Sequence, residues 1–175
     1  HLTFSPPLFG APLAGITNSA FRRLVSDFGG YGALFTEMLS AKQILREDLF
    51  QSPALKRRPQ EGPLIYQLMM QDAGQLEEII GRLSACAPDG LDINLACHAP
   101  AIRTRRAGSG LYEDADMLKQ VLRAARKAWP GLLLVKIRLG SEKPGWEAPF
   151  IERLKFFEDA GVDALTFHPR FFEDK

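Results

Sequence analysis

Cysteine is scarce in this sequence, which holds only Cys86 and Cys97 among its 175 residues. Two cysteines are too few for a disulfide framework, and a chain of this length can bury a core without covalent staples. We therefore expect a reducing, cytoplasmic setting, with one disulfide bond as the alternative.

Long apolar runs and a dominant charge sign are missing as well. No stretch approaches the roughly 18 consecutive apolar residues of a membrane-spanning helix, and the first residues lack a basic segment followed by an apolar one. These absences predict a soluble, unexported protein with no membrane partner. With 22 Lys and Arg against 21 Asp and Glu, the net charge of +1 neither favours nor excludes nucleic acid, so local basic clusters must decide.

The usual motifs of nucleotide and metal sites do not occur either. The sequence has no GxGxxG and no Walker A pattern, which leaves a Rossmann or P-loop site without local support. It also lacks a close His/Cys set or a carboxylate pair, and the neighbours Cys97 and His98 alone are a weak metal signal. We predict no metal site.

Strand-like and helix-like segments alternate along the chain, whose 46% hydrophobic and 25% charged residues are typical of one globular domain. Short apolar runs predict strands at 8–15, 33–39, 63–70, 90–96, 132–140 and 163–169. Helical spacing of apolar residues predicts helices at 19–28, 41–48, 73–85, 114–129 and 148–161. This alternation predicts a parallel sheet, because a helical crossover is the usual route to a parallel neighbour.

Two architectures fit this order, an open doubly wound sheet and a (β/α)8 TIM barrel that needs about 250 residues. Polar residues follow nearly every predicted strand: Thr36 and Glu37, Gln67, Asn94 with Cys97, Lys136 with Arg138, and His168 with Arg170. In a barrel these ends converge on one mouth, where active sites lie, whereas an open sheet spreads them out. We therefore predict an α/β fold, a parallel TIM barrel truncated to about its first six β/α units, with residues 1–175 as an incomplete catalytic domain.

The polar residues of this mouth suit a planar, anionic ligand such as a reduced flavin. Gln67 and Asn94 offer amide donors and acceptors. Lys136 and Arg138 are two residues apart, on one face of an apolar strand, and require an anionic partner there. A lone cysteine is most often a small buried hydrophobic residue, but the position of Cys97 after a strand and among polar neighbours favours a functional thiol.

Seven segments resemble, in order and spacing, the tRNA-dihydrouridine synthases: APLAGITNSAFRRL (11–24), TEM (36–38), YQL (66–68), DINLAC (92–97), RRAGSGL (105–111), VKIRLG (135–140) and HPR (168–170). The resemblance runs from about residue 10 to residue 170. It implies a flavoenzyme that reduces uridine in tRNA to dihydrouridine with FMN, which NADPH recharges. It also implies two further strands and a helical tRNA-binding domain that this sequence lacks.

The resemblance further assigns roles to individual residues. Cys97 is the counterpart of the family's general acid, which protonates C5 of the uracil after hydride reaches C6. The residues matching the flavin contacts are Gln67, Asn94, Lys136, His168 and the backbone of Pro12, Leu13 and Ala14. The expected substrate contacts are Glu37, Arg138 and Arg170. Independently of the resemblance, the basic cluster RTRR directly follows the cysteine motif, so Arg103 and Arg105 are expected to face tRNA phosphates, with a solvated loop as the alternative.

The sequence departs from the family pattern around two of these motifs. Ala96, Cys97 and His98 stand where the family usually has glycine, cysteine and proline, and HPRFF replaces HGRT near the end. Two other functions therefore stay open: a flavin barrel that acts on a free pyrimidine, such as a dihydroorotate or dihydropyrimidine dehydrogenase, and an inactive scaffold that binds RNA or a protein partner.

Overall fold

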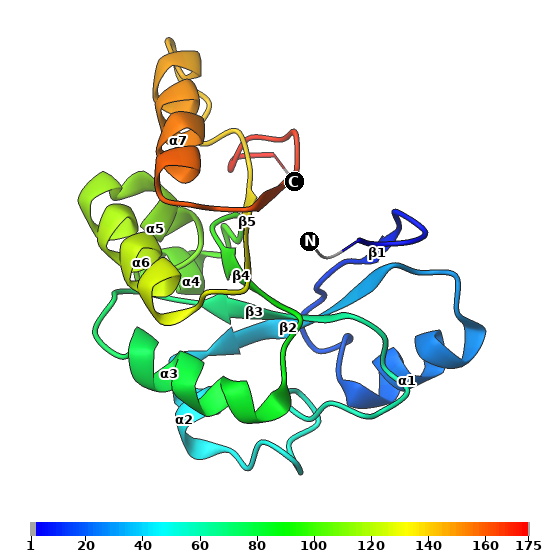
Figure 1. Cartoon of the computed structure of the whole chain (residues 1–175). Helices are drawn as coiled ribbons and strands as arrows, with labels where there is room; N and C mark the ends of the chain where they lie inside the picture. The colour runs from blue at the N-terminus through cyan, green and yellow to red at the C-terminus, as the bar shows by residue number, and fades with distance from the viewer. Residues whose placement is uncertain (1–2, 175) are drawn as a thin grey trace.

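The structure, a computed structural model, describes residues 3–174 and contains one six-stranded sheet. Its strands are β1 (Phe9–Gly10), β2 (Ala33–Ser40), β3 (Leu64–Met69), β4 (Gly90–Asn94), β5 (Leu132–Ile137) and β6 (Ala164–Phe167). All neighbouring strands are parallel and lie in chain order. A doubly wound sheet reverses its strand order, so the sequential order confirms the barrel type. Figure 1 shows the sheet curled into part of a barrel, with β1 and β6 on either side of the opening.

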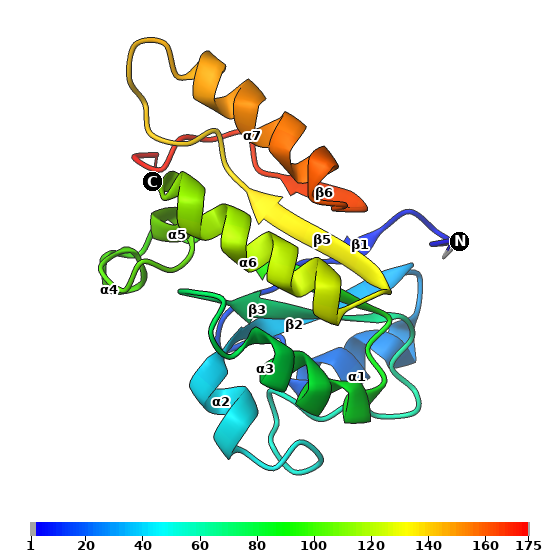
Figure 2. The same cartoon turned by 60° about the vertical axis from the view of Figure 1, so that its left-hand side comes forward.

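Helices cover the convex face of the sheet, and Figure 2 shows α6 and α7 running along β5 and β6. The helical segments of residues 3–174 are α1 (Ser19–Phe28), α2 (Ala41–Arg46), α3 (Leu76–Leu83), η1 (Ser84–Cys86), α4 (Pro100–Arg103), α5 (Ser109–Glu113), α6 (Ala115–Ala128) and α7 (Glu147–Asp159), of which α4 and α5 follow the carboxyl end of β4. The predicted long helices are confirmed, and Asn18 and Asp114 cap α1 and α6 through their side chains. A membrane span would need a longer and more apolar helix than any in residues 3–174.

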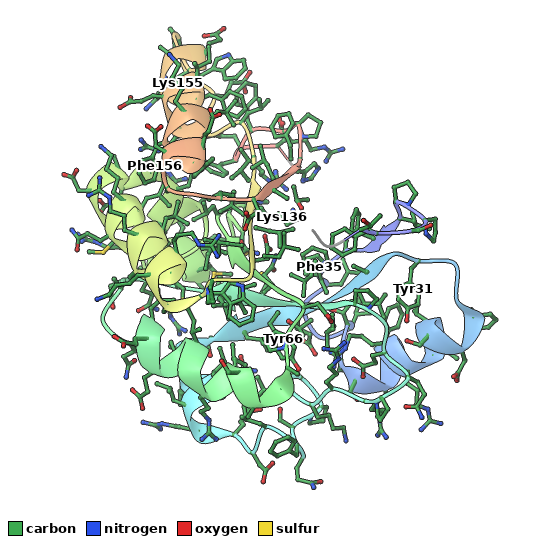
Figure 3. All side chains as sticks on the ribbon, viewed as in Figure 1. Tyr31, Phe35, Tyr66, Lys136, Lys155 and Phe156 are labelled. Atoms are coloured by element: carbon green, nitrogen blue, oxygen red, sulfur yellow. The ribbon has the colours of Figure 1, made fainter. Side chains whose placement is uncertain are left out.

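Two apolar cores lie on opposite faces of the sheet. The larger one fills the space between sheet and helices and includes the predicted stripes of α3 and α6. The smaller one, on the concave face, joins Ala33, Phe35, Ile65 and Leu134. In Figure 3 Phe35 lies toward the concave space, whereas Tyr66 lies on the helix side. The alternation of side chains along each strand therefore supplies both cores.

The two outer strands are poorly buried, and the first is much shorter than predicted. β1 is two residues long rather than spanning 8–15, and Leu8 and Phe9 are 60% and 45% exposed. Within residues 3–174 β1 pairs with β2 only, and Gly15 at φ 73° turns the chain away. In the same part of the chain β6 pairs with β5 only, and its burial is equally poor. Both edges of the sheet are therefore open within the described residues.

The apolar stripe of α1 also faces outward. Phe21, Leu24 and Phe28 are exposed, while Ser19 and Arg22 are the buried residues of this helix. Each of the three guanidinium nitrogens of Arg22 donates a hydrogen bond there, one to Glu61 and two to backbone carbonyls. The helical periodicity of this segment was thus predicted correctly, but it does not mark the face that packs against the sheet.

Candidate functional site

The concave face carries apolar side chains at the start of its strands and polar ones at their carboxyl ends. Register partners in a parallel sheet share a face, and Gln67 pairs with Asp92 while Asn94 pairs with Lys136. Lys136 in turn pairs with Thr166, two residues before His168. The four residues predicted to hold a flavin, Gln67, Asn94, Lys136 and His168, therefore come from four adjacent strands or strand ends at one rim.

A chain of buried hydrogen bonds runs along this rim to Cys97. The Gln67 amide nitrogen donates to Asp92 Oδ2 at 2.5 Å, and the Asn94 amide nitrogen donates to Gln67 Oε1 at 2.9 Å. Asn94 Oδ1 then accepts the backbone N–H groups of Ala96 and Cys97, at 3.1 and 3.0 Å. Sequence reasoning missed Asp92, although a charged residue inside an apolar strand, two positions from Asn94, was the available signal.

Asp92 is the most deeply buried carboxyl group of the site, with an exposed fraction of 0%. Burial raises its pKa to about 7, while the hydrogen bond from Gln67 and the charge of Lys136 act in the opposite direction. Its Oδ1 atom has no hydrogen-bond partner within residues 3–174. A buried carboxylate oxygen that receives no hydrogen bond lowers the stability of the fold, so packing alone does not explain why residue 92 is an aspartate.

Cationic groups gather beside this network, and Figure 3 shows Lys136 on the concave side. Partial burial lowers the pKa of Lys136, as does Arg138, whereas Asp92 and Cys97 raise it. The pKa of His168 is lowered by desolvation and then by Arg138, Lys136 and Arg170. The lowered pKa of His168 favours a neutral imidazole beside these cations.

Cys97 lies three residues beyond β4, half-buried, on a loop that the segment 107–110 holds from the other side. Ser109 donates its backbone N–H to the Cys97 carbonyl at 2.9 Å. Gly108 has φ 57°, and a Cβ atom there would lie 2.4 Å from that carbonyl oxygen. The AGSG segment thus supports the cysteine loop, a role that the spacing of the motifs did not reveal.

We expect Gly108→Ala to displace the Cys97 loop, because both the steric clash and the left-handed backbone disfavour any side chain at this position. The expected loss is about 1 to 3 kcal/mol in the free energy of unfolding, measured by urea denaturation of the full-length protein. Gly81→Ala in helix α3 is the control, since a Cβ atom there meets nothing within 4 Å outside the backbone of its own helix. Equal stability of the two variants would contradict the proposed close approach.

Glu37 and the predicted flavin contacts of the first loop lie at the β1 side of the mouth. Glu37 Oε2 accepts the backbone N–H of Gly15 at 2.6 Å, directly after Pro12, Leu13 and Ala14. Thr17 closes the same loop by bonding Leu13 through both its hydroxyl and its backbone N–H. The Glu37 carboxylate therefore positions the loop, and its predicted contact with a substrate stays a prediction.

The remaining predicted substrate contacts are less tightly grouped. Arg138 donates to the carbonyls of Phe171 and Asp174 and so ties the last residues to the rim. Arg103 forms an exposed ion pair with Glu113 at 2.8 Å. Arg105 instead lines a groove of about 670 Å³ between α2 and α4, together with Lys42 and Arg46. These last two cations were not predicted, because nothing in the sequence links α2 to the segment after Cys97.

The sequence profile of one family, described as dihydrouridine synthase (Dus), matches residues 9–175 of the chain. The chain belongs to the dihydrouridine synthase family. It is 29% identical over 163 residues to tRNA-dihydrouridine synthase B of Pasteurella multocida, covering 93% of this chain and 48% of that protein. It is 32% identical over 170 residues to a probable tRNA-dihydrouridine synthase of Helicobacter pylori, covering 96% of this chain and 50% of that protein. The chain thus spans about half the length of the relatives that it matches.

Solved structures resemble this dihydrouridine synthase chain in fold alone. A phosphonopyruvate hydrolase superposes with a TM-score of 0.59 at 13% identity, over 94% of this chain and 59% of that one. A 2,3-dimethylmalate lyase superposes with a TM-score of 0.55 at 17% identity, over 93% of this chain and 56% of that one. Neither likeness carries a function at this level of identity.

Proposed function

We propose that this chain is the greater part of the catalytic barrel of an enzyme that reduces uridine to 5,6-dihydrouridine in tRNA, with FMN as its flavin and NADPH as the reductant. Membership of the dihydrouridine synthase family and the names of the relatives support the activity. The observation that carries it is the convergence of two amides, a lysine and a cysteine loop at one concave rim.

The residues of this rim fit a flavin ring. Gln67 and Asn94 each keep one amide hydrogen beyond the bonds described above, which can meet carbonyl or nitrogen acceptors of a ring edge. Lys136 brings positive charge to the same face, and His168 adds an imidazole from the next strand end. A bound FMN would supply the hydride for C6 of the uracil. The pyrimidine edge would be held by Gln67 and Asn94, and the anionic ring by Lys136.

Cys97 is the proton donor in this proposal. Its thiol would protonate C5 of the uracil, so that the proton leaves sulfur as the new C–H bond forms. The backbone of the residue is held on both sides, by Asn94 at its N–H and by Ser109 at its carbonyl. These two contacts position the thiol without using its sulfur atom.

We further propose that two additional β/α units close the barrel between β6 and β1. The open edges carry exposed apolar side chains where a neighbouring strand or helix would pack, among them Phe9, Leu24, Leu165 and Phe167. The half coverage of the relatives leaves room for these units and for a helical domain that binds tRNA. Loops of the missing units are where this type of fold binds phosphate, so flavin retention needs the longer protein.

The groove lined by Lys42, Arg46 and Arg105 is the best candidate for the tRNA backbone within the described residues, because three cations there face one carboxylate, Asp72. We expect Arg105→Gln to weaken binding of every tRNA by a similar factor and to lower the slope of log K against log salt concentration by about 1. Arg123→Gln, on the exposed side of α6, is the matched control. An unchanged salt slope for Arg105→Gln would remove this groove from the interface.

The activity is tested by the visible spectrum of the full-length protein, followed by reduction assays with tRNA, free uracil and orotate. A flavin spectrum and NADPH-dependent reduction of tRNA alone are the expected results. Turnover of free uracil or orotate, and not of tRNA, would favour a flavin-dependent dehydrogenase of free pyrimidines, whose flavin the same rim could bind. A colourless protein that takes up no FMN would favour a binding scaffold without catalysis.

A further inference from the structure

Asp92 is the one member of the buried network that the proposed reaction does not use. It lies in the middle of β4 with no exposed surface, and its two oxygens differ sharply in their surroundings. Oδ2 receives the amide of Gln67, whereas Oδ1 has no partner within residues 3–174. Burying a carboxylate oxygen that receives no hydrogen bond destabilises the fold, and an apolar residue at this position would avoid that loss. We therefore ask what the carboxylate does to its neighbours.

Gln67 and Asn94 link Asp92 to Cys97 through a chain of hydrogen bonds, and in this chain the donors and acceptors can be assigned in only one way. The backbone N–H groups of Ala96 and Cys97 need an acceptor, so Asn94 must present Oδ1 to them and its amide nitrogen to Gln67. Gln67 must then present Oε1 to Asn94 and its own amide nitrogen to position 92. Position 92 therefore has to accept a hydrogen bond. An ionised carboxylate can only accept, and so it excludes the reversed arrangement.

We propose that Asp92 is a positioning residue, which fixes the orientation of the Gln67 and Asn94 amides and thereby holds the backbone of Cys97 at the mouth of the barrel. The inference deepens the proposed function, because it says how the cysteine loop is kept in place. The charge of Lys136 acts on the same carboxylate and supports its ionised form. Lys136 thus contributes to the orientation of the amides from the neighbouring strand.

Asp92→Asn tests the direction of the bonds with little change of shape. An asparagine that turns Oδ1 toward Gln67 keeps the arrangement, but it places an amide nitrogen where Oδ1 of Asp92 finds no partner. An asparagine that turns its nitrogen toward Gln67 reverses the two amides and takes the acceptor away from Cys97. The unsatisfied donor raises the energy of the first arrangement and so narrows its gap to the second, in which Asn94 no longer accepts the N–H groups of Ala96 and Cys97. These two N–H groups are therefore open to exchange more often.

A double variant, Asp92→Asn with Gln67→Glu, restores every bond. The carboxylate introduced at position 67 would accept the new amide at position 92 through one oxygen and the amide of Asn94 through the other. Asn94 then again offers Oδ1 to Cys97. The total charge of the site is unchanged. A general loss of packing or stability at Asp92 could not be repaired by a second substitution of this kind, which makes the pair diagnostic.

The measurement is backbone amide hydrogen exchange at Ala96 and Cys97 in the full-length protein, at about pH 8.5, above the pKa of Asp92. We expect roughly tenfold faster exchange in Asp92→Asn, the factor for one hydrogen bond of typical net strength, and a return toward the parent rate in the double variant. The control is Asp89→Asn, because Asp89 lies just before β4 and bonds Arg57 and Leu64 instead.

Three results would overturn the proposal: unchanged exchange in Asp92→Asn, a double variant no better than the single one, or an equal effect of Asp89→Asn. If Asp92→Asn does not fold, a double variant that folds with parent-like exchange supports the proposal, and one that also fails overturns it. The exchange rates require neither flavin nor RNA. They therefore test the role of Asp92 separately from the proposed enzymatic activity. If the protein proved inactive, the expected exchange rates would be the same.

Discussion

Cys97→Ala in the full-length protein is expected to slow reduction of tRNA uridine by about 100-fold or more, while the flavin spectrum stays that of the parent enzyme. The reason is that the substitution removes the proton donor but leaves both backbone contacts of residue 97, to Asn94 and to Ser109, in place. The loop should therefore keep its shape. Single-turnover reduction of tRNA by the prereduced enzyme measures the step directly.

Cys86→Ala is the matched control for this prediction. Cys86 is buried between the sheet and the helices, where burial raises the pKa of its thiol. Its loss should cost some stability but leave turnover unchanged, because it lies in the larger core on the convex side. Full activity of Cys97→Ala, or equal inactivation of both variants, would rule out the role assigned to Cys97.

Glu61→Gln is expected to lower the free energy of unfolding by about 3 kcal/mol, because it leaves the buried guanidinium of Arg22 without its counter-charge. The two side chains are 1% and 0% exposed, and Arg22 Nε lies 2.7 Å from Glu61 Oε2. Arg22 also donates to the carbonyls of Thr17 and Lys56, so the pair joins α1 to the connector before β3. Urea denaturation of the full-length protein measures the loss.

The double variant Arg22→Met with Glu61→Leu separates the charge from the packing. Replacing both members of a buried ion pair by apolar residues is often close to neutral, so this variant should be more stable than Glu61→Gln. Asp163→Asn is the control, since the side chains of its ion pair with Arg126 are 25% and 44% exposed, so that the pair should contribute only about 1 kcal/mol. A loss for Glu61→Gln no larger than that of the control would mean that the pair is not effectively buried.

The alternation of strands and helices was predictable because each central element buries one regular face. Leu76, Ile79, Ile80 and Leu83 recur at helical spacing and are all buried in α3. The same reasoning failed for α1, whose apolar stripe is exposed, and for β1, which within residues 3–174 has only β2 as a neighbour. Local periodicity reveals that a face is apolar, but it does not reveal which partner covers that face.

The candidate site was predictable only to the extent that strand ends converge. Gln67, Asn94 and Lys136 followed from polar residues in apolar strands, and register pairing brings them together. The contacts between distant segments could not be foreseen, because they depend on how loops fold back: Glu37 on Gly15, Gly108 against Cys97, and Arg105 beside α2. The position of Cys97 after a polar strand end already marked it as a functional thiol, and the motif resemblance added the expected role of a general acid.

The most direct measurement is a crystal structure of the full-length protein with FMN and a short uridine-containing RNA. The flavin ring should lie on the concave rim against Gln67, Asn94 and Lys136, and the Cys97 sulfur should face C5 of the uracil within about 4 Å, the reach of a proton transfer as the groups close. A flavin bound elsewhere, or a sulfur turned away from the base into apolar side chains, would contradict the assignment of this rim as the site of uridine reduction.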